Sequence, residues 1–482
     1  MTGAPPRLDA SGAGPLIYKF GGSSLADADR IAHVAKLIAA APSPPVVVVS
    51  AVAGVTDRLA ELVLARTRGE SAASGPLAAG LSSLRERHRT LARSLAAGSD
   101  ADPLLERVDA IFDAVLSDLD GLDAGRGTGL DAGRGTGLDG GAGADRIRAL
   151  GEDLSVELVV HALHRLGREA RAVDARTVVR TDGAFGSARP NVDAIAEAAE
   201  SWLRPVVAHG EIAVMQGFVG ADAQGRTTTL GRGGSDYTAA LVGAALDARA
   251  VHIWTDVDGV LSGDPRAVEA PRTLERLGFQ EAVELAHFGA RVLHPGAAKY
   301  AVSRGVPVRI RSTFAPERAG TLVLDDRWGP PEIAAVAFKP GVALIQVRSH
   351  PSALPYGFLA RVFGVLARHE LPVDLVATSH TSTAFTLDAD ADVSGAAREL
   401  GHFADVTVRT GLATVTVVGH GLLEEPGIGA RVFQVVNRNR VHLVSQASNV
   451  SLSFVVDEDS APELVRRLHR TLIGARPAEV ST

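Results

Sequence analysis

Residues 46–57 read Val-Val-Val-Val-Ser-Ala-Val-Ala-Gly-Val-Thr-Asp, and they set the fold class. Four consecutive valines are typical of a strand that is buried on both faces of a parallel sheet. Small residues then form a turn, and a helix is expected to begin near Asp57. The same order occurs upstream, where apolar residues 16–19 lead through a glycine and serine turn at 20–24 into an amphipathic helix that reaches about residue 40. Two such units in succession predict an α/β fold with ligands at the carboxyl ends of the strands.

Composition limits the class of protein. The chain has 482 residues, of which 46% are hydrophobic and 22% charged, which is typical of a globular protein with two or three domains. The net charge of −7 argues against a nucleic-acid partner. Because cysteine is absent, disulfides, thiolate metal sites and cysteine nucleophiles are excluded. No apolar run approaches the ~20 residues of a membrane span, and the first 14 residues do not resemble a signal peptide, so we expect a cytoplasmic protein without membrane association.

A glycine-rich stretch at residues 227–240 is expected to bind an anion. It reads Thr-Thr-Thr-Leu-Gly-Arg-Gly-Gly-Ser-Asp-Tyr-Thr-Ala-Ala. Its three glycines allow the backbone to approach a ligand, and Ser235 or Asp236 is a natural N-cap for the helix that follows. The free amides of that helix would then face the same cleft as the Arg232 guanidinium. The alternative is a tight strand-to-helix turn with a surface arginine.

The middle of the chain contains an internal repeat. Residues 121–128 are copied at 129–136 and begun again at 137–139. The repeat offers Gly-x-Gly matches, but no strand precedes them, so a dinucleotide fingerprint is disfavoured. We interpret residues 119–144 as a flexible surface loop that arose by duplication. Residues 58–118 before it are expected to be helical, and further strands are expected at 170–174, 211–215, 251–256 and 306–310.

After Pro330 and Pro331 the pattern changes to short alternating strands and helices. Elements expected at 342–348, 357–369, 373–378, 382–387, 394–402 and 404–409 form one βαββαβ unit. A second unit, expected at 412–418, 427–438, 442–447, 451–456 and 460–474, lacks one strand, which residues 333–338 are expected to supply. The sequence therefore predicts two interleaved ferredoxin-like modules, residues 340–410 and residues 333–338 plus 411–475. Their unpaired sheet edges predict a homodimer or homotetramer.

Seven short motifs start at Lys19, Val49, Gly151, Gln216, Thr227, Trp254 and Phe288, and they read KFGGSS, VSAVAGVT, GEDLS, QGF, TTTLGRGGSD, WTDV and FGARVLHP. They occur in the order found in aspartokinases, and the chain resembles the single-function members with an amino-acid kinase domain and two ACT regulatory modules. The resemblance covers about residues 16–475 without the repeat. It implies a disordered tail over residues 1–15 and an amino-acid kinase fold over 16–325, a largely parallel open sheet sandwiched by helices. The implied reaction is ATP-dependent phosphorylation of the β-carboxylate of L-aspartate, the first step of lysine, threonine and methionine biosynthesis.

The residue types fit this chemistry. A carboxylate is already a nucleophile at neutral pH, so phosphoryl transfer requires mainly positioning and charge neutralisation. Lys19 at a strand end is suited to the transferring phosphoryl group, unless it is a solvated edge lysine. An anion cradle is offered by the backbone amides of Gly21, Gly22 and Ser23. Arg232 suits the substrate α-carboxylate, and Glu152 suits its ammonium unless it only caps a helix.

The resemblance implies further site residues. Asp236 would orient Lys19, and the aspartate pocket would be completed by Ser50, Thr56, Phe218 and Ser235. Nucleotide contacts would include Thr255, Asp256, Arg266 and Arg291, with Asp264 and Pro265 fixing the loop that presents Arg266. Leu261 and Arg291 depart from the family pattern, in which an aromatic residue and a lysine are common. No carboxylate cluster suggests a protein-built metal site, so Mg²⁺ is expected to arrive on the ATP phosphates.

An amino-acid effector is expected at the ACT module of residues 340–410. The amides of Gly357, Phe358 and Leu359 would hold its carboxylate, and Asp374 its ammonium. Ser379 is followed by His380, where lysine-inhibited relatives carry an acid. We therefore expect a weak response to lysine or none, or a response to another amino acid, unless an acid such as Asp388 substitutes.

Two rival functions are weighed against an active aspartokinase. A kinase of the same fold that acts on glutamate, acetylglutamate or a nucleotide is disfavoured by the ACT modules and by residues 231–236. A catalytically inactive ACT-type sensor is disfavoured because Lys19, Glu152, Arg232 and Asp236 are all present.

Overall fold

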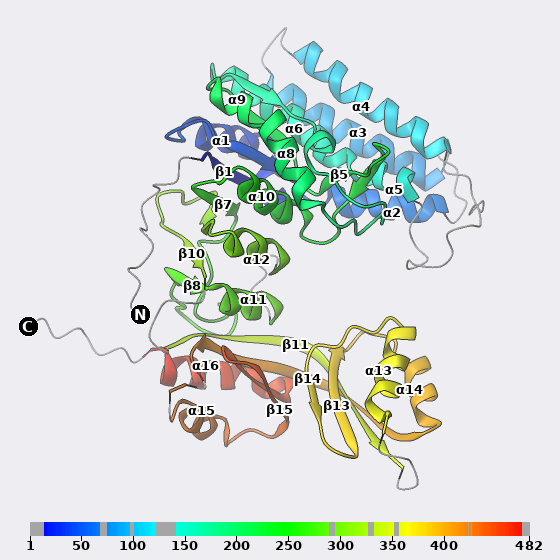
Figure 1. Cartoon of the computed structure of the whole chain (residues 1–482), viewed down its shortest axis with the longest axis vertical. Helices are drawn as coiled ribbons and strands as arrows, with labels where there is room; N and C mark the ends of the chain where they lie inside the picture. The colour runs from blue at the N-terminus through cyan, green and yellow to red at the C-terminus, as the bar shows by residue number, and fades with distance from the viewer. Residues whose placement is uncertain are drawn as a thin grey trace, which may run out of the picture. The chain divides into compact units, whose positions relative to one another are not determined.

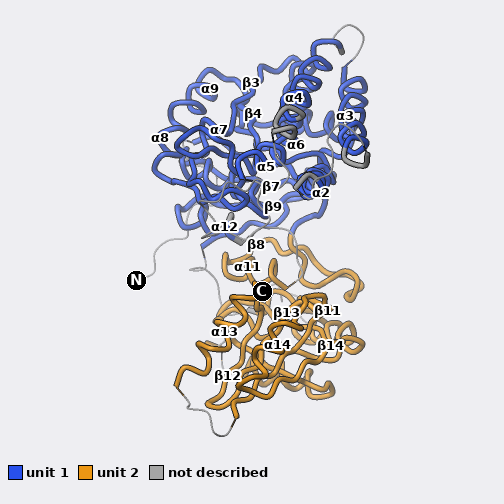
Figure 2. Tube along the Cα trace, turned by 90° about the vertical axis from the view of Figure 1, so that its right-hand side faces the viewer, with its two compact units in different colours: residues 1–259, 292–325 blue, residues 260–291, 326–482 orange. Residues whose placement is uncertain are grey.

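The computed structural model describes residues 14–67, 75–96, 101–121, 141–288, 295–325, 332–350, 356–422, 424–425 and 427–474. The chain divides into two compact units, coloured blue and orange in Figure 2. The first comprises residues 1–259 and 292–325, and the second comprises residues 260–291 and 326–482. Residues 260–291, which the resemblance assigns to the kinase domain, thus lie in the second unit. The expected N-terminal tail up to residue 13 and residues 122–140 of the repeat loop lie outside the described residues.

The first unit is built on a largely parallel sheet, as the sequence predicts (Figure 1). All neighbouring strands in its order β3-β4-β2-β1-β7-β9 are parallel, and β10 is antiparallel to β9. The strands are β1 (Leu16–Phe20), β2 (Val46–Val49), β3 (Ala170–Ala172), β4 (Ile212–Gln216), β7 (Ala250–Thr255), β9 (Val308–Ser312) and β10 (Thr321–Leu324). The sequence missed β10 and a two-stranded hairpin of β5 (Val219–Ala221) and β6 (Thr227–Thr229).

Helices cover both faces of this sheet. Side chains alternate along a strand, so Leu16, Tyr18 and Phe20 enter the core beside α1 and α6, while Ile17 points to the opposite face. There α10 approaches so closely that a Cβ at Gly243 would lie 2.6 Å from Val251 Cγ2. The helices are α1 (Ala28–Ala39), α2 (Val55–Thr67), α3 (Gly75–Leu95), α4 (Ala101–Gly121), α5 (Gly141–Arg148), α6 (Leu150–Arg165), α7 (Ala175–Val178), α8 (Val192–Trp202), α9 (Arg204–Ala208), α10 (Gly234–Ala245) and α12 (Pro295–Ser303). The expected helical region 58–118 therefore contains three helices, α2 to α4.

The second unit contains a six-stranded antiparallel sheet in the order β12-β13-β11-β14-β16-β15. Its strands are β11 (Glu332–Ser349), β12 (Val376–Thr378), β13 (Ser382–Asp388), β14 (Ala404–His420), β15 (Val441–Ser448) and β16 (Ser451–Asp457). The strands expected at 333–338 and 342–348 form the single strand β11, and those expected at 404–409 and 412–418 form β14. Bulges between Lys339 and Leu344 interrupt the register of the two long strands.

The long strands interleave two modules, as predicted. The second half of β11 pairs with β13 and with the first half of β14, whereas the first half of β11 pairs with the second half of β14. Each half-sheet has its own apolar core, one with α13 (Phe358–Arg368) and α14 (Ser394–Gly401), the other with α15 (Ile428–Val436) and α16 (Ala461–Leu472). The unit also contains β8 (Arg276–Gly278) and α11 (Phe279–His287). Ala267 and Val268 from the preceding loop are buried in the second core.

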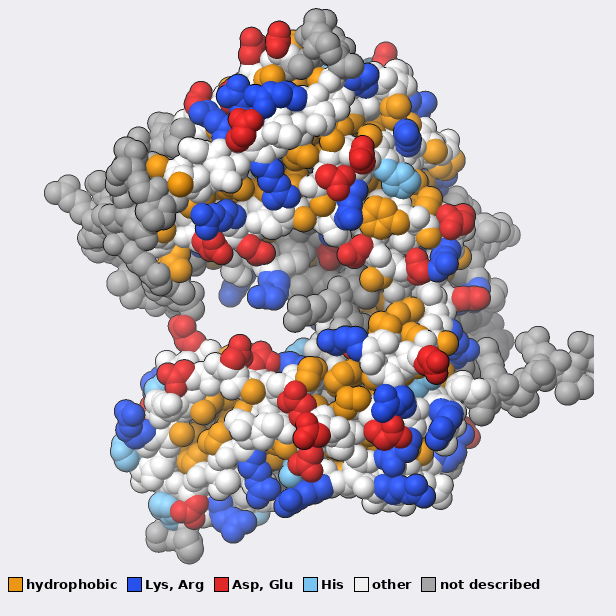
Figure 3. Space-filling view, turned by 180° about the vertical axis from the view of Figure 1, so that it is seen from behind, with side chains coloured by type: hydrophobic (Ala, Val, Ile, Leu, Met, Phe, Trp, Pro, Cys, Tyr) orange, Lys and Arg blue, Asp and Glu red, His pale blue; other side chains and the backbone are white. Residues whose placement is uncertain are grey.

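Acidic and basic side chains are mixed on the face of the molecule shown in Figure 3. No helix in the described ranges is long and apolar enough to cross a bilayer.

Candidate active site

The candidate site lies where four parallel strands of the first unit end. Phe20 at the end of β1 is in register with Val49 of β2 and Trp254 of β7, and Val49 is in register with Gln216 of β4. The residues that directly follow these strand ends therefore gather at one edge of the sheet. They include the predicted site residues Gly21, Gly22, Ser23, Ser50, Phe218 and Asp256.

Lys19 and Asp236 form an ion pair at this edge. The Lys19 Nζ lies 2.7 Å from a carboxylate oxygen of Asp236, and the side chains are 12% and 13% exposed. Lys19 occupies a central strand, between Val48 of β2 and Ile253 of β7. It is therefore a largely buried lysine with a fixed partner and not a solvated edge lysine.

The turn after β1 passes close to the Lys19 side chain. A Cβ placed on Gly21 would lie 3.6 Å from Lys19 Nζ, and one on Gly22 would lie 2.7 Å from the carbonyl oxygen of Ala51. Only glycine fits at position 22, because the turn packs directly against the turn after β2. Residues 22–25 then form a short 3₁₀ helix. The two turns together make a compact backbone surface beside the lysine.

The expected N-cap at Ser235 or Asp236 is wrong by two or three residues. Helix α10 begins at Gly234, and its N-cap is Gly233 with φ 73°, a left-handed conformation that glycine adopts without strain. No side chain caps the helix. Ser235 is buried against Gly217, where an added Cβ would lie 2.5 Å from Ser235 Cβ, and Arg232 is exposed beside the helix start.

Phe218 has an uncommon backbone conformation. Its φ is 68°, and its N–H donates to Thr238 Oγ1 at 3.1 Å while its carbonyl accepts from Leu230 N–H at 2.9 Å. A left-handed non-glycine residue costs of order 1 kcal/mol or more, and such strain is concentrated at functional sites. The Phe218 ring packs against Gly234, where a Cβ would lie 2.7 Å from it.

Glu152 is a buried carboxyl group in the first turn of α6. It is 2% exposed, and its Oε1 accepts from the Ala51 N–H at 3.1 Å, so it reaches the turn after β2 and does not cap its own helix. Within the described residues its Oε2 is buried and has no hydrogen-bond partner. Burial raises the pKa of Glu152 to about 8. A buried acceptor without a donor is suited to a ligand cation.

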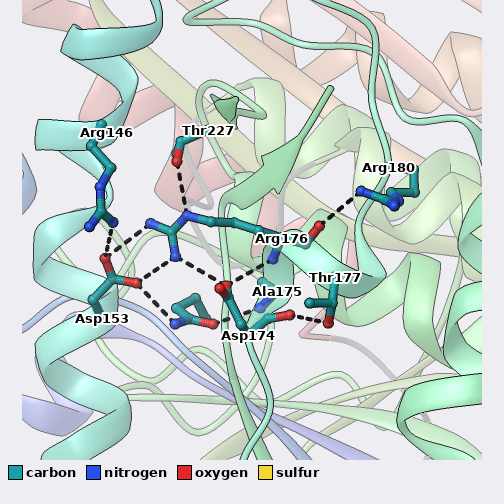
Figure 4. Close-up of polar contacts among 9 residues, drawn as sticks. Arg146, Asp153, Asp174, Ala175, Arg176, Thr177, Arg180 and Thr227 are labelled. Carbon is teal, nitrogen blue, oxygen red and sulfur yellow. Dashed lines mark hydrogen bonds and ion pairs between the residues drawn. The ribbon is translucent and has the colours of Figure 1, made fainter. Parts of the chain in front are cut away.

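Two further carboxylates, not predicted as site residues, hold this region together. Asp153 accepts hydrogen bonds from Arg176, Arg146 and Gln216 (Figure 4). Asp145 on α5 is fully buried, and its Oδ2 accepts from the N–H groups of Gly186 at 2.8 Å and Thr229 at 2.7 Å. Asp153 stands next to Glu152 in its motif, but no sequence signal pointed to Arg176 or Asp145, because their partners are distant in the chain.

The predicted nucleotide residues are divided between the units. Thr255 ends β7 in the first unit, where its Oγ1 donates to Asp256 Oδ1 at 3.1 Å. Arg266 lies in the second unit, and Asp264 accepts a forked pair of hydrogen bonds from its guanidinium, at 3.0 Å from Nε and 2.6 Å from Nη2. Arg291 lies outside the described residues. Thr56, in the first turn of α2, is half-buried.

The predicted effector residues lie in the first ACT-like module. Helix α13 begins at Phe358 after Gly357, whose φ is 81°. Asp374 is already paired, with Lys339 Nζ at 2.6 Å and His287 Nε2 at 3.3 Å. Ser379 Oγ is 2.7 Å from Ser382 Oγ, and His380 is exposed. No group of three His, Asp or Glu side chains in the described ranges is arranged to hold a metal ion.

Comparisons with known proteins agree with this architecture. Residues 15–312 match the model of the amino acid kinase family, and residues 415–472 match an ACT domain model. The chain is 35% identical to lysine-sensitive aspartokinase 3 of Escherichia coli over 470 residues, which cover 95% of this chain and 99% of the relative. It is 31% identical to the chloroplastic aspartokinase 3 of Arabidopsis thaliana, covering 94% and 80% of the two chains.

Two crystal structures of E. coli aspartokinase III superpose well on the chain. The complex with aspartate and ADP, in the R-state, has a TM-score of 0.77, and the complex with lysine and aspartate, in the T-state, has a TM-score of 0.80. Each is 34% identical in sequence and covers 95% of this chain and 99% of the other.

Proposed function

The chain belongs to the aspartokinases of the amino acid kinase family, and from that premise we propose which of its residues carry out the reaction. An aspartokinase transfers the γ-phosphoryl group of ATP to the β-carboxylate of L-aspartate. A carboxylate oxygen forms a bond to the γ-phosphorus, the bond to the bridging oxygen breaks, and ADP leaves. No proton has to be removed from the nucleophile, so the residues act through positioning and charge.

The observation that carries the proposal is the Lys19–Asp236 pair beside the glycine turn. Lys19 is a cation held near the carboxyl end of the central strand β1, and the Asp236 carboxylate, 2.7 Å from its Nζ, fixes its direction. The backbone of Gly21 lies next to it, and the Gly21 N–H donates to the Trp254 carbonyl at 3.3 Å. The amides of Gly22 and Ser23 are therefore the proposed anion donors beside the cation. We assign Lys19 to the transferring phosphoryl group, whose developing charge it neutralises.

Aspartate is proposed to bind between the turn after β2, the start of α6 and the start of α10. Glu152 would pair its free Oε2 with the substrate ammonium, because a buried acceptor without a donor favours a cation. The exposed guanidinium of Arg232 would form a forked contact with the α-carboxylate. The pocket would be completed by Ser50, Thr56, Phe218 and Ser235.

Four residues that the resemblance implies are proposed as nucleotide contacts. They are Thr255, the last residue of β7, the adjacent Asp256, and the arginines Arg266 and Arg291. Mg²⁺ would be held mainly by the nucleotide phosphates and water, and it would neutralise phosphate charge during transfer. The glycine turn at residues 21–23 fits the phosphates.

Three further properties are proposed. The chain works in the cytoplasm, it assembles as a homodimer or homotetramer through its ACT modules, and the module containing α13 binds an amino-acid effector. The helix start at Gly357 supports the last point, because its free amides suit a carboxylate. The proposed effector is also supported by a structural relative, E. coli aspartokinase III, which has been solved in complex with lysine and aspartate.

An ADP-release assay with three acceptor conditions tests the function. With Mg²⁺-ATP we expect rapid ADP formation with L-aspartate, and only background rates with L-glutamate or no acceptor. Trapping the acyl phosphate with hydroxylamine should give the hydroxamate of aspartate. Equal rates with glutamate would contradict the assigned substrate, and no turnover with any acceptor would favour the inactive sensor.

A further inference from the structure

Asp153 and Arg176 form a largely buried ion pair in the first unit (Figure 4). Arg176 Nη1 donates to Asp153 Oδ1 at 2.9 Å and Nη2 donates to Oδ2 at 3.0 Å, which is a forked contact. The side chain of Arg176 is 14% exposed and that of Asp153 is 11% exposed. Breaking such a pair by removing one partner leaves the other charge buried and uncompensated. The pair is therefore a fixed element of the first unit.

The pair joins three segments that carry proposed substrate residues. Asp153 directly follows Glu152 on α6. Gln216, the last residue of β4 before Gly217 and Phe218, donates from Nε2 to Asp153 Oδ1 at 2.9 Å and accepts from the Ala175 N–H at 2.8 Å. Arg176 Nε donates to Thr227 Oγ1 at 2.9 Å, at the start of the strand that leads to Arg232 and Ser235. The guanidinium thus bonds directly to two of the three segments, and Asp153 connects it to the third through Gln216.

The two partners also act on the charge of Glu152 in opposite directions. After burial and hydrogen bonding to the backbone, the negative charge of Asp153 raises the pKa of Glu152 and the positive charge of Arg176 lowers it. Arg146 from α5 and Asp174 before α7 flank the pair, each bonded to one of its members. Asp153 and Arg176 are the charged side chains with the largest effect on the pKa of Glu152.

We propose that Arg176 and Asp153 are positioning residues for aspartate binding, which hold Glu152, Phe218 and the Arg232 segment in register and balance the charge of Glu152. The proposal rests on the proposed role of Glu152 as the partner of the substrate ammonium. We assign neither Arg176 nor Asp153 a contact with the reacting atoms. Both act through the residues that they hold in place. If the pair had only a structural role, its removal would lower stability but leave the pH dependence of kcat/KM for aspartate unchanged.

The test compares kcat, KM for aspartate and the pH profile of kcat/KM in the full-length protein. Arg176→Met should raise KM by about ten- to a hundredfold, because misplacement of a binding group by ~1 Å has effects of this size, with kcat changed less than about threefold. The acidic limb of the kcat/KM profile of Arg176→Met should move to higher pH by about one pH unit, because loss of the cation raises the pKa of Glu152. Asp153→Asn should move the same limb to lower pH. Arg176→Lys, which retains the charge but not the fork, should restore the limb while leaving KM raised.

Two controls separate the possible failures. Arg171→Met removes an exposed arginine that pairs with Glu211, and it should change neither KM nor the pH profile. Glu152→Gln should raise KM and abolish the acidic limb. The inference is overturned if the acidic limb of the kcat/KM profile moves in the same direction in Arg176→Met and Asp153→Asn, or moves in neither. The role of Glu152 would be unaffected by that result. A Glu152→Gln variant with normal KM and profile overturns both. If Arg176→Met does not fold, Arg176→Lys and Asp153→Asn decide the matter.

Discussion

Lys19 Nζ lies 2.7 Å from a carboxylate oxygen of Asp236, so the end of a central strand is joined to the first turn of α10. The pair links two motifs that are more than 200 residues apart in the sequence. It fixes a cation beside the backbone of the glycine turn, where the phosphoryl group is proposed to pass. The two residues therefore form the centre of the proposed active site.

Replacing Lys19 by alanine should reduce turnover far more than aspartate binding. Loss of one stabiliser of transition-state charge typically costs ~3–4 kcal/mol, or about a hundred- to a thousandfold in kcat. Steady-state kinetics would show this fall with KM for aspartate nearly unchanged. Lys36→Ala, an exposed lysine on α1, is the matched control. Near-normal kcat in Lys19→Ala would remove Lys19 from the reaction.

Aspartate affinity should depend on pH through Glu152. Because the pKa of this carboxyl group is raised to about 8, it is mostly protonated in the free protein at neutral pH. Pairing with the substrate ammonium favours the ionised form, so binding should release a proton. The apparent Kd for aspartate should rise by about tenfold for each pH unit below 8.

Calorimetry in buffers of different ionisation enthalpy measures this proton release directly. Glu152→Gln should bind aspartate weakly and with little pH dependence between pH 6 and 8. A parent protein whose affinity does not change over this range would show that Glu152 is not the partner of the ammonium.

Deleting residues 121–136 should leave folding and activity nearly unchanged. These residues are two copies of one glycine-rich unit with no apolar face to bury, and the free energy of loop closure changes slowly with loop length. Melting temperature and kcat/KM of the shortened protein are the measurements. A melting temperature lowered by several degrees would reveal that the repeat packs against the folded chain.

Full-length protein should be a homodimer or homotetramer in light scattering at assay concentrations. Strands β12 and β15 are the two edges of the six-stranded sheet, and each carries exposed valines such as Val376 and Val444. Unpaired edges with apolar side chains favour pairing with a second copy. Val376→Lys or Val444→Lys should lower the mass, whereas Leu166→Lys on the first unit should not. A monomeric parent protein contradicts the assembly.

The fold could be predicted largely because its signals are local. Four valines at residues 46–49 identify a buried parallel strand, and the alternation after residue 331 identifies two modules. The alternating pattern predicted separate strands at 333–338 and 342–348. The structure has one continuous strand, β11, because Gly341 at φ 68° and the nearby bulges allow it to take part in both half-sheets. The assignment of residues 260–291 to the second unit has no local signal at all.

In the candidate site, too, residues in short local motifs could be predicted, whereas residues with distant partners could not. The strand end and the glycine turn predicted Lys19 and Gly22 because these residues lie in one short motif. The partnership of Asp236 with Lys19 was implied by the family resemblance. Arg176 and Asp145 were missed, since an arginine or aspartate looks the same in sequence whether it is solvated or bonded to a partner elsewhere. The helix start was misplaced because Gly233, which is left-handed, caps α10 in place of a side chain.

Lysine should inhibit this protein weakly or not at all. Asp374, the expected partner of an effector ammonium, is held by Lys339 and His287, so a ligand cation would have to displace one of them. His380 offers no negative charge for the lysine side chain, and a protonated histidine would repel it. A buried ammonium without its partner loses on the order of 2–5 kcal/mol, which weakens binding by tens- to thousandsfold.

His380→Glu should therefore increase sensitivity to lysine, with His402→Glu, an exposed histidine of the same module, as the control. Inhibition curves with lysine, threonine and methionine, run on the parent and both variants, make the comparison. Asp388 is the alternative acid, and its carboxylate lies 2.7 Å from Lys339 Nζ, so an effector cation would have to compete with that lysine. If Asp388 substitutes for the missing acid, the parent would respond to lysine and Asp388→Asn would lose the response. Tight inhibition of both the parent and Asp388→Asn by lysine alone would show that neither residue governs the effector, because the binding energy would then come from groups other than these two side chains.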